Sequence, residues 1–265
     1  AYVGLDRKAI YSSYNLYFNT HAPILSAKKF GLISTMGIDL NRLFFGMTEK
    51  KIEIIIDNNE KNEPIEEVKY NILDIDFDKL KGANPDIYAW IHIPAVNVDY
   101  PILQNEDDNA YYLNHTVNGQ KSVYGSIYTE NYNNKDFSDF NTVIYGHNMK
   151  NGTMFGSLKK FRDSAFFNEN RFINIYTPGR ILKYEIFAAY TWDNKHILLS
   201  RNFENEYNRK VYLEEIFAVR DMNSQISRDI QVTENDKIIT LSTCMNDKSK
   251  RFLVSGVLVY DSAED

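Results

Sequence analysis

The chain has 265 residues, a formal net charge of −6 and 43% hydrophobic residues, a composition typical of an ordinary globular protein. The acidic balance argues against nucleic acid as a general partner, because phosphate binding needs a basic surface. A single cysteine excludes an internal disulfide and leaves one thiol with potential reactivity.

The first 66 residues are predicted to form an N-terminal extension and linker of unknown role, followed by a domain over residues 67–265. A helix is predicted around Ser26 to Phe45, and the charged segment 57–67 is interrupted by Pro64, as linkers often are. No stretch reaches the ~18 uncharged apolar residues that a membrane-spanning helix needs. Because the chain begins with Ala1 and not with methionine, we expect any targeting or anchoring segment to lie outside it.

From residue 70 onward the pattern is mostly β. A short helix with Phe77 and Leu80 is expected to end before the turn at residues 84–86. Strands are predicted at 89–93, 99–103, 125–128, 141–145, 172–176, 181–190, 237–244 and 252–260. Pro178 and Gly179 occupy the central positions of a type II turn between two of them.

Two further segments have apolar residues at helical spacing. One is predicted to start at Thr153 as N-cap and to contain Met154, Leu158 and Phe161. The other covers residues 204–220, with an apolar stripe of Phe203, Tyr207, Val211 and Phe217. Many short strands with few helices predict a closed or nearly closed β-barrel, because closure removes exposed edges.

The lone thiol, Cys244, ends one predicted strand, and Arg251 opens the next. The two side chains would therefore share one end of a sheet, which suits a nucleophile beside a fixed positive charge. The guanidinium would stabilise negative charge that develops on a substrate carbonyl oxygen. The alternatives are a small buried hydrophobic cysteine and a surface arginine that flanks a strand.

Among the five histidines, His147 is the best-placed base, since it follows a predicted strand and Gly146. His92 alternates within a strand and is expected to face solvent, whereas His115 and His196 lie in predicted loops without a recognisable partner. The alternative for each is a solvated or structurally bonded ring. No metal site is expected, since one cysteine excludes multi-thiolate zinc sites and no zinc-binding histidine pattern occurs. No phosphate-binding glycine loop occurs either.

Several strings together resemble the sortase family, and class B in particular. They are residues 84–91, residues 144–149 with 154–158, and residues 240–244 followed by Arg251, supported by 100–104 and 108–113. The resemblance covers roughly residues 70–262 and leaves the first 56 residues outside it.

The resemblance implies a mainly β fold with helices: an eight-stranded β-barrel with N-terminal helices and a long helix between strands six and seven, which matches 204–220. It implies a cysteine transpeptidase without a cofactor, in which Cys244 is the nucleophile, His147 the acid/base and Arg251 the oxyanion or substrate arginine. Asn109, Ser242 and Tyr145 are expected to line the peptide groove.

The implied partners are surface proteins with a C-terminal sorting signal, commonly Asn-Pro-x-Thr-(Asn/Gly), cleaved after threonine, and an amine of peptidoglycan or its lipid-linked precursor. The implied location is the extracellular face of the cytoplasmic membrane of a Gram-positive bacterium, with the anchor outside this chain. Two alternatives stay open: a cysteine endopeptidase that only hydrolyses, and an inactive peptide-binding surface protein.

Overall fold

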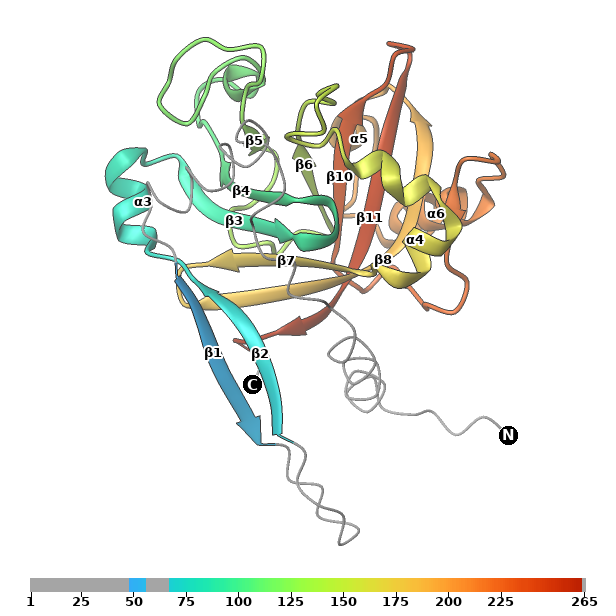
Figure 1. Cartoon of the computed structure of the whole chain (residues 1–265). Helices are drawn as coiled ribbons and strands as arrows, with labels where there is room; N and C mark the ends of the chain where they lie inside the picture. The colour runs from blue at the N-terminus through green and yellow to red at the C-terminus, as the bar shows by residue number, and fades with distance from the viewer. Residues whose placement is uncertain (1–47, 56–66, 264–265) are drawn as a thin grey trace, which may run out of the picture. The chain divides into compact units, whose positions relative to one another are not determined.

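The computed structural model describes residues 48–55 and 67–263 (Figure 1). Strands β1 (Thr48–Ile55) and β2 (Glu67–Asp74) pair antiparallel in a two-stranded sheet, with Thr48 opposite Asp74. They lie on either side of the segment expected as a linker, most of which falls outside the described residues, as does the helix predicted at 26–45. The division of the chain after residue 66 stays a prediction.

In the described part of the chain, the main sheet closes on itself. Its strand order is β11-β10-β6-β5-β4-β3-β7-β8-β9, and β11 also pairs with β8, so that eight strands form a barrel and β9 (Gln225–Ile226) extends the edge of β8. The barrel strands are β3 (Ile87–Ile93), β4 (Val98–Leu103), β5 (Ile127–Thr129), β6 (Asn141–Tyr145), β7 (Phe172–Thr177), β8 (Arg180–Asp193), β10 (Ile238–Cys244) and β11 (Lys250–Asp261). The predicted eight-stranded barrel is confirmed.

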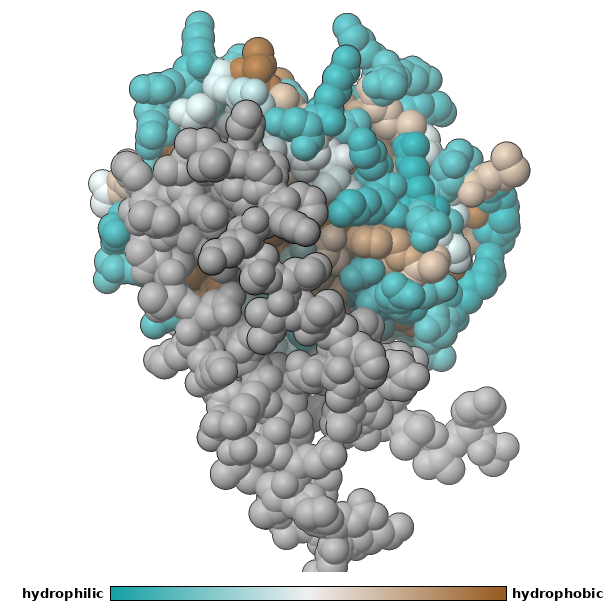
Figure 2. Space-filling model, viewed as in Figure 1, coloured by the Kyte–Doolittle hydropathy of each residue, from teal (hydrophilic) through white to brown (hydrophobic). Residues whose placement is uncertain are grey.

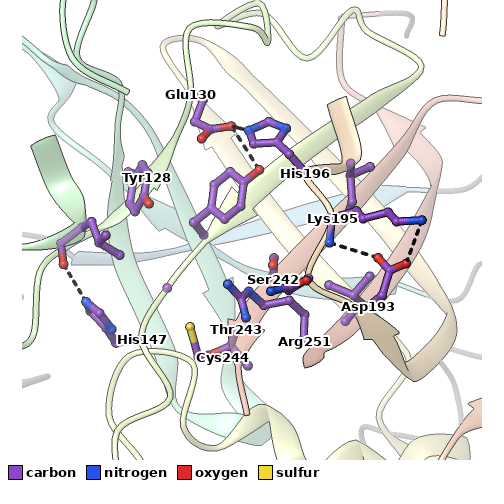
Figure 3. A pocket seen from close by; sticks show the side chains of 16 residues that line it. Tyr128, Glu130, His147, Asp193, Lys195, His196, Ser242, Thr243, Cys244 and Arg251 are labelled. Carbon is purple, nitrogen blue, oxygen red and sulfur yellow. Dashed lines mark hydrogen bonds and ion pairs between the residues drawn. The ribbon is translucent and has the colours of Figure 1, made fainter. Parts of the chain in front are cut away.

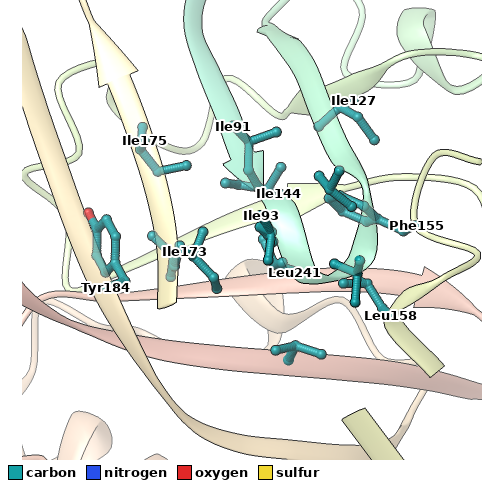
Figure 4. Packing of buried hydrophobic residues seen from close by; sticks show 14 of the residues in the cluster. Ile91, Ile93, Ile127, Ile144, Phe155, Leu158, Ile173, Ile175, Tyr184 and Leu241 are labelled. Atoms are coloured by element: carbon teal, nitrogen blue, oxygen red, sulfur yellow. The ribbon is translucent and has the colours of Figure 1, made fainter. Parts of the chain in front are cut away.

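Alternation along the strands divides the core between the two faces of the sheet. On β10, Ile239 and Leu241 point into the barrel, where they join residues such as Phe155 and Ile175 (Figure 4). Ile238 belongs to a second apolar cluster on the outer face, which includes residues of the long helix. On the side of the molecule shown in Figure 2, the described residues present mostly hydrophilic side chains.

The helices lie in the connections between strands. They are α3 (Phe77–Ala83), α4 (Ser164–Glu169), α5 (Ile197–Ser200) and α6 (Glu206–Ala218), with short 3₁₀ segments at Pro94–Val96 (η1), Tyr111–Leu113 (η2) and Leu158–Arg162 (η3). α6 falls between β8 and β10, the sixth and seventh barrel strands, as predicted. Among the described residues, none of the helices combines the length and the apolar run needed to cross a bilayer.

The apolar stripe predicted for α6 is partly wrong. Tyr212, Leu213 and Ile216 are the buried residues of this helix, whereas Tyr207 is 72% exposed. The helix begins at Glu206, and the face that packs on the barrel is not the face that carries the predicted stripe. Residue spacing alone did not determine which of two overlapping apolar stripes packs inward.

The loop after β6 also differs from its prediction. No helix begins at Thr153, because Met154 has a left-handed backbone (φ +53°) and forms an isolated antiparallel bridge with Asn148. Helical structure starts only at Leu158, and Asp163 caps α4. The type II turn is consistent with the positive φ of Gly179 (+71°) between β7 and β8.

Candidate active site

Strand register places Cys244 beside Arg251. The two residues are direct partners at the end of the antiparallel pair β10–β11. Side chains of directly opposed residues point to the same face of a sheet and lie close together. The face is the outer one, because Ile239 and Leu241, at odd positions of β10, point into the barrel.

The parallel pairing of β6 with β10 brings His147 to the same level. The last pair of this ladder is Ser242 opposite Tyr145, and the Gly146 N–H donates to the Ser242 carbonyl at 3.2 Å. Cys244 and His147 each lie two residues beyond that pair, Cys244 as the last residue of β10 and His147 in the loop that follows β6. The thiol, the imidazole and the guanidinium therefore come from the ends of three adjacent strands.

These residues line one pocket of about 230 Å³ (Figure 3). Its lining comprises Leu113, Tyr128, Glu130, Tyr145, Gly146, His147, Asp193, Asn194, Lys195, His196, Ile197, Ser242, Thr243, Cys244, Arg251 and Leu253. Five of the six residues predicted from the sequence are in this set. The sixth, Asn109, is not: its side chain bonds to Asn131 in the loop after β5, through contacts of 2.9 and 2.6 Å. A substrate contact for Asn109 stays a prediction.

Cys244 is an exposed free thiol at the rim of this pocket. Its backbone carbonyl accepts a hydrogen bond of 2.8 Å from the Asn148 side-chain amide. This bond joins the end of β10 to the loop that follows His147. A thiol on an anchored backbone and open to solvent can reach a substrate carbonyl, whereas the alternative of a buried hydrophobic cysteine does not fit this exposure.

The imidazole of His147 is held by a backbone carbonyl. Its Nε2 lies 2.6 Å from the oxygen of Leu113, the last residue of η2, so Nε2 carries the proton and donates. In the described structure no hydrogen bond joins this ring to the thiol of Cys244. The ring thus lies at the edge of the pocket with its proton directed away from the sulfur (Figure 3).

The guanidinium of Arg251 is oriented by its own loop. Nη1 donates to the carbonyls of Lys248 and Lys250, at 3.2 and 3.1 Å. A guanidinium has five N–H donors, and among the described residues Nε and Nη2 have no hydrogen-bond acceptor. They are available to an anionic oxygen in the pocket.

Sequence reasoning missed a second polar group in the pocket. His196, predicted to have no partner, lies with Nε2 2.7 Å from Oε2 of Glu130, and the Tyr145 hydroxyl donates to the same oxygen at 3.1 Å. The ring of Tyr145 stacks on Tyr128. Burial, and then the charge of Glu130, raise the pKa of Tyr145, so its hydroxyl stays protonated. No short-range signal reveals this group, because its members lie far apart in the sequence.

His92 also differs from its prediction. It is half-buried, and its Nδ1 lies 3.2 Å from the buried carboxylate of Asp99, which also accepts a hydrogen bond from Trp90. The register pairs His92 directly with Asp99 across β3 and β4. The pair belongs to the barrel wall and lies outside the pocket lining.

Comparison with known proteins identifies similar chains. The model of the sortase domain family matches residues 91–259. Sortase B of Listeria monocytogenes is 34% identical over 183 residues, which cover 68% of this chain and 72% of that protein.

Among solved structures, Clostridium perfringens sortase B is 37% identical, with a TM-score of 0.62 over 69% of this chain and 99% of that one. A Staphylococcus aureus sortase B–substrate complex is 29% identical, with a TM-score of 0.61 over 69% of this chain and 83% of the other.

Proposed function

Because the chain belongs to the sortase family and, within it, to class B, whose members are cysteine transpeptidases, we propose that Cys244, His147 and Arg251 are its catalytic residues. Sortases act on proteins with a sorting signal and on cell-wall precursors. The observation that supports the three roles is that the three side chains line one pocket, with Cys244 directly opposite Arg251 and His147 just beyond the end of β6.

In the first step, the thiolate of Cys244 attacks the carbonyl carbon of the threonine in the sorting signal. A carbon–sulfur bond forms, and the electron pair of the carbonyl moves onto its oxygen. Arg251 stabilises that oxyanion through the N–H groups that its loop carbonyls leave unused. When the tetrahedral intermediate collapses, the carbon–nitrogen bond breaks. His147, as imidazolium, protonates the leaving amine.

In the second step, an acceptor amine attacks the thioester. The now neutral His147 takes a proton from the amine, a new amide bond forms and the thiolate of Cys244 leaves. This chemistry requires the His147 ring to turn from the Leu113 carbonyl toward the sulfur.

We infer the finer identity of the partners from the class B resemblance. The substrate is a surface protein whose C-terminal signal is cleaved after threonine, and the acceptor is an amine of peptidoglycan or of its lipid-linked precursor. Sortase homologues act at the cell surface of Gram-positive bacteria, and we place this domain at the outer face of the cytoplasmic membrane.

Intact-mass spectrometry with a sorting-signal peptide tests the roles. The wild-type protein gains the mass of the acyl fragment as a thioester, whereas Cys244→Ala gains none. Addition of a glycine oligomer then yields a ligated peptide. Hydrolysis alone, in the presence of excess amine, would favour the endopeptidase alternative, and absence of any acyl adduct on the wild type would favour an inactive peptide-binding protein. Cleavage by Cys244→Ala would refute the mechanism.

A further inference from the structure

A largely buried carboxylate faces the pocket at the end opposite to Cys244 (Figure 3). Glu130 follows β5, and its side chain is 14% exposed. Tyr145 and His196 both contact its Oε2, at 3.1 and 2.7 Å. The second oxygen, Oε1, has no hydrogen-bond donor among the described residues. A hydrogen bond from Tyr145 therefore holds the carboxylate, the ring of His196 lies against it, and Oε1 is left for a ligand.

Among the described residues, no lysine or arginine contacts Glu130. The Leu199 N–H donates to Nδ1 of His196 at 3.2 Å, at the start of α5, so Nε2 is the ring nitrogen that faces the carboxylate. The Tyr145 hydroxyl, whose pKa is raised, is neutral. The ammonium of Lys195, another pocket residue, lies 3.8 Å from the carboxylate of Asp193. Oε1 of Glu130 is thus a carboxylate oxygen without a lysine or arginine in contact among the described residues.

We propose that Glu130 is a specificity-determining residue, whose Oε1 accepts a hydrogen bond from a side-chain N–H donor of the sorting signal, either a carboxamide or an ammonium group. This inference rests on the proposed function. A carboxylate that is largely removed from water requires a replacement donor when a peptide fills the pocket. The same oxygen repels a peptide carboxylate, so Glu130 selects both for donors and against acids.

The sheet register indicates where in the peptide the donor lies. Thr129 is opposite Ile144 in the antiparallel pair β5–β6, so Glu130 is level with Val143. His147 is four residues further along the same chain direction, which corresponds to about 13 Å at ~3.3 Å per residue. An extended peptide covers that length in about four residues. We place the donor within about four residues of the scissile bond and, because the implied sorting signal lies mostly before the cleaved bond, test the four positions on its acyl side.

Fluorogenic peptides with paired substitutions at each of these four positions test the proposal. The Asn and Asp peptides differ in a side-chain N–H donor against a carboxylate of nearly the same shape. The Lys and Met peptides differ in the presence of an ammonium group on an otherwise apolar side chain. At one position, kcat/KM of the wild-type protein is expected to favour Asn over Asp by about 10- to 100-fold. A preference for Lys over Met at that position identifies an ammonium ligand, and its absence identifies a carboxamide.

Glu130→Gln is expected to reduce the Asn/Asp ratio to within about threefold or to invert it, because the amide both donates and accepts. Glu106→Gln is the matched control, since it removes an equal charge from a side chain that is 80% exposed and outside the pocket lining. Tyr145→Phe keeps the carboxylate and removes the hydroxyl that donates to it. The Asn/Asp ratio of kcat/KM is therefore expected to fall without inverting. This variant tests the inference if Glu130→Gln fails to fold.

Equal Asn/Asp ratios in the wild type, Glu130→Gln and Tyr145→Phe would overturn the inference. If the wild type still forms its thioester in that case, the proposed function stands and only the role of Glu130 falls. Absence of thioester formation would instead refute the proposed function.

Discussion

Gly146 is expected to be among the least replaceable residues near the site. A Cβ atom on Gly146 would lie 2.6 Å from Cδ1 of Ile127 and 2.7 Å from Cδ2 of Phe155, distances that real Cβ contacts do not adopt. Both neighbours are buried in the barrel interior, so neither can move into solvent. Overpacking of a filled core costs about 1–3 kcal/mol. We therefore expect Gly146→Ala to lower the free energy of unfolding by that amount.

Urea denaturation and thermal melting measure this effect. For a domain of this size, about 1–3 kcal/mol corresponds to a lowering of Tm by about 2–12 °C. Gly82→Ala is the matched control: nothing lies within 4 Å of its added Cβ, and it sits in helix α3. There alanine is expected to stabilise by up to ~1 kcal/mol, since glycine is a poor helix former.

A double-mutant cycle separates steric overlap from a backbone effect. Phe155→Leu removes the ring atoms that the new methyl group would meet, so Gly146→Ala in that background is expected to cost at least ~1 kcal/mol less than in the wild type. The packing argument would be refuted if the two substitutions changed the free energy of unfolding additively, or if Gly146→Ala left it unchanged.

Three other outcomes are expected. Arg251→Lys lowers the rate of thioester formation by about 10²–10³, because an ammonium lacks the planar fork, and unchanged single-turnover kinetics would contradict this. The hydrogen bond from Arg180 holds the pKa of the buried Asp261 carboxylate below 3.8, so the stabilisation from this pair is complete above that pH and is lost as the pH falls through the lower, folded-state pKa. Acid titration of Asp261→Asn should lack this loss, and at neutral pH its free energy of unfolding should be about 1–3 kcal/mol lower, because Arg180 is partly exposed and keeps its bond to the Asp136 carbonyl. The pH–rate profile is expected to be bell-shaped, because the proposed first step needs a thiolate nucleophile together with a protonated general acid, and a flat profile from pH 5 to 10 would oppose it.

The sequence predicted the barrel because its strands are short, apolar and separated by clear turn residues. It also placed Cys244 and Arg251 at facing strand ends, since a short polar loop between two strands forces that geometry. The pairing of β6 with β10 joins residues about a hundred positions apart, so the level of His147 relative to Cys244 could not be derived from local pattern.

The errors have physical causes. The Thr153 segment has helical spacing, but a left-handed residue at Met154 and tertiary contacts override the local preference. His196 had no visible partner because Glu130 reaches it only through the folded barrel. Both cases show that the spacing of apolar residues predicts only local structure. Contacts between polar side chains on different loops depend on the topology of the fold.

Closure of the barrel by β11 has a consequence for incomplete chains. This strand lies between β10 and β8 and brings Arg251 opposite Cys244. A polypeptide truncated before Lys250 would leave two open sheet edges and a thiol without its cationic partner. If Cys244 and Arg251 act as proposed, nascent or prematurely terminated chains therefore lack the arginine that forms the thioester site, and this site is completed by the same strand that closes the barrel.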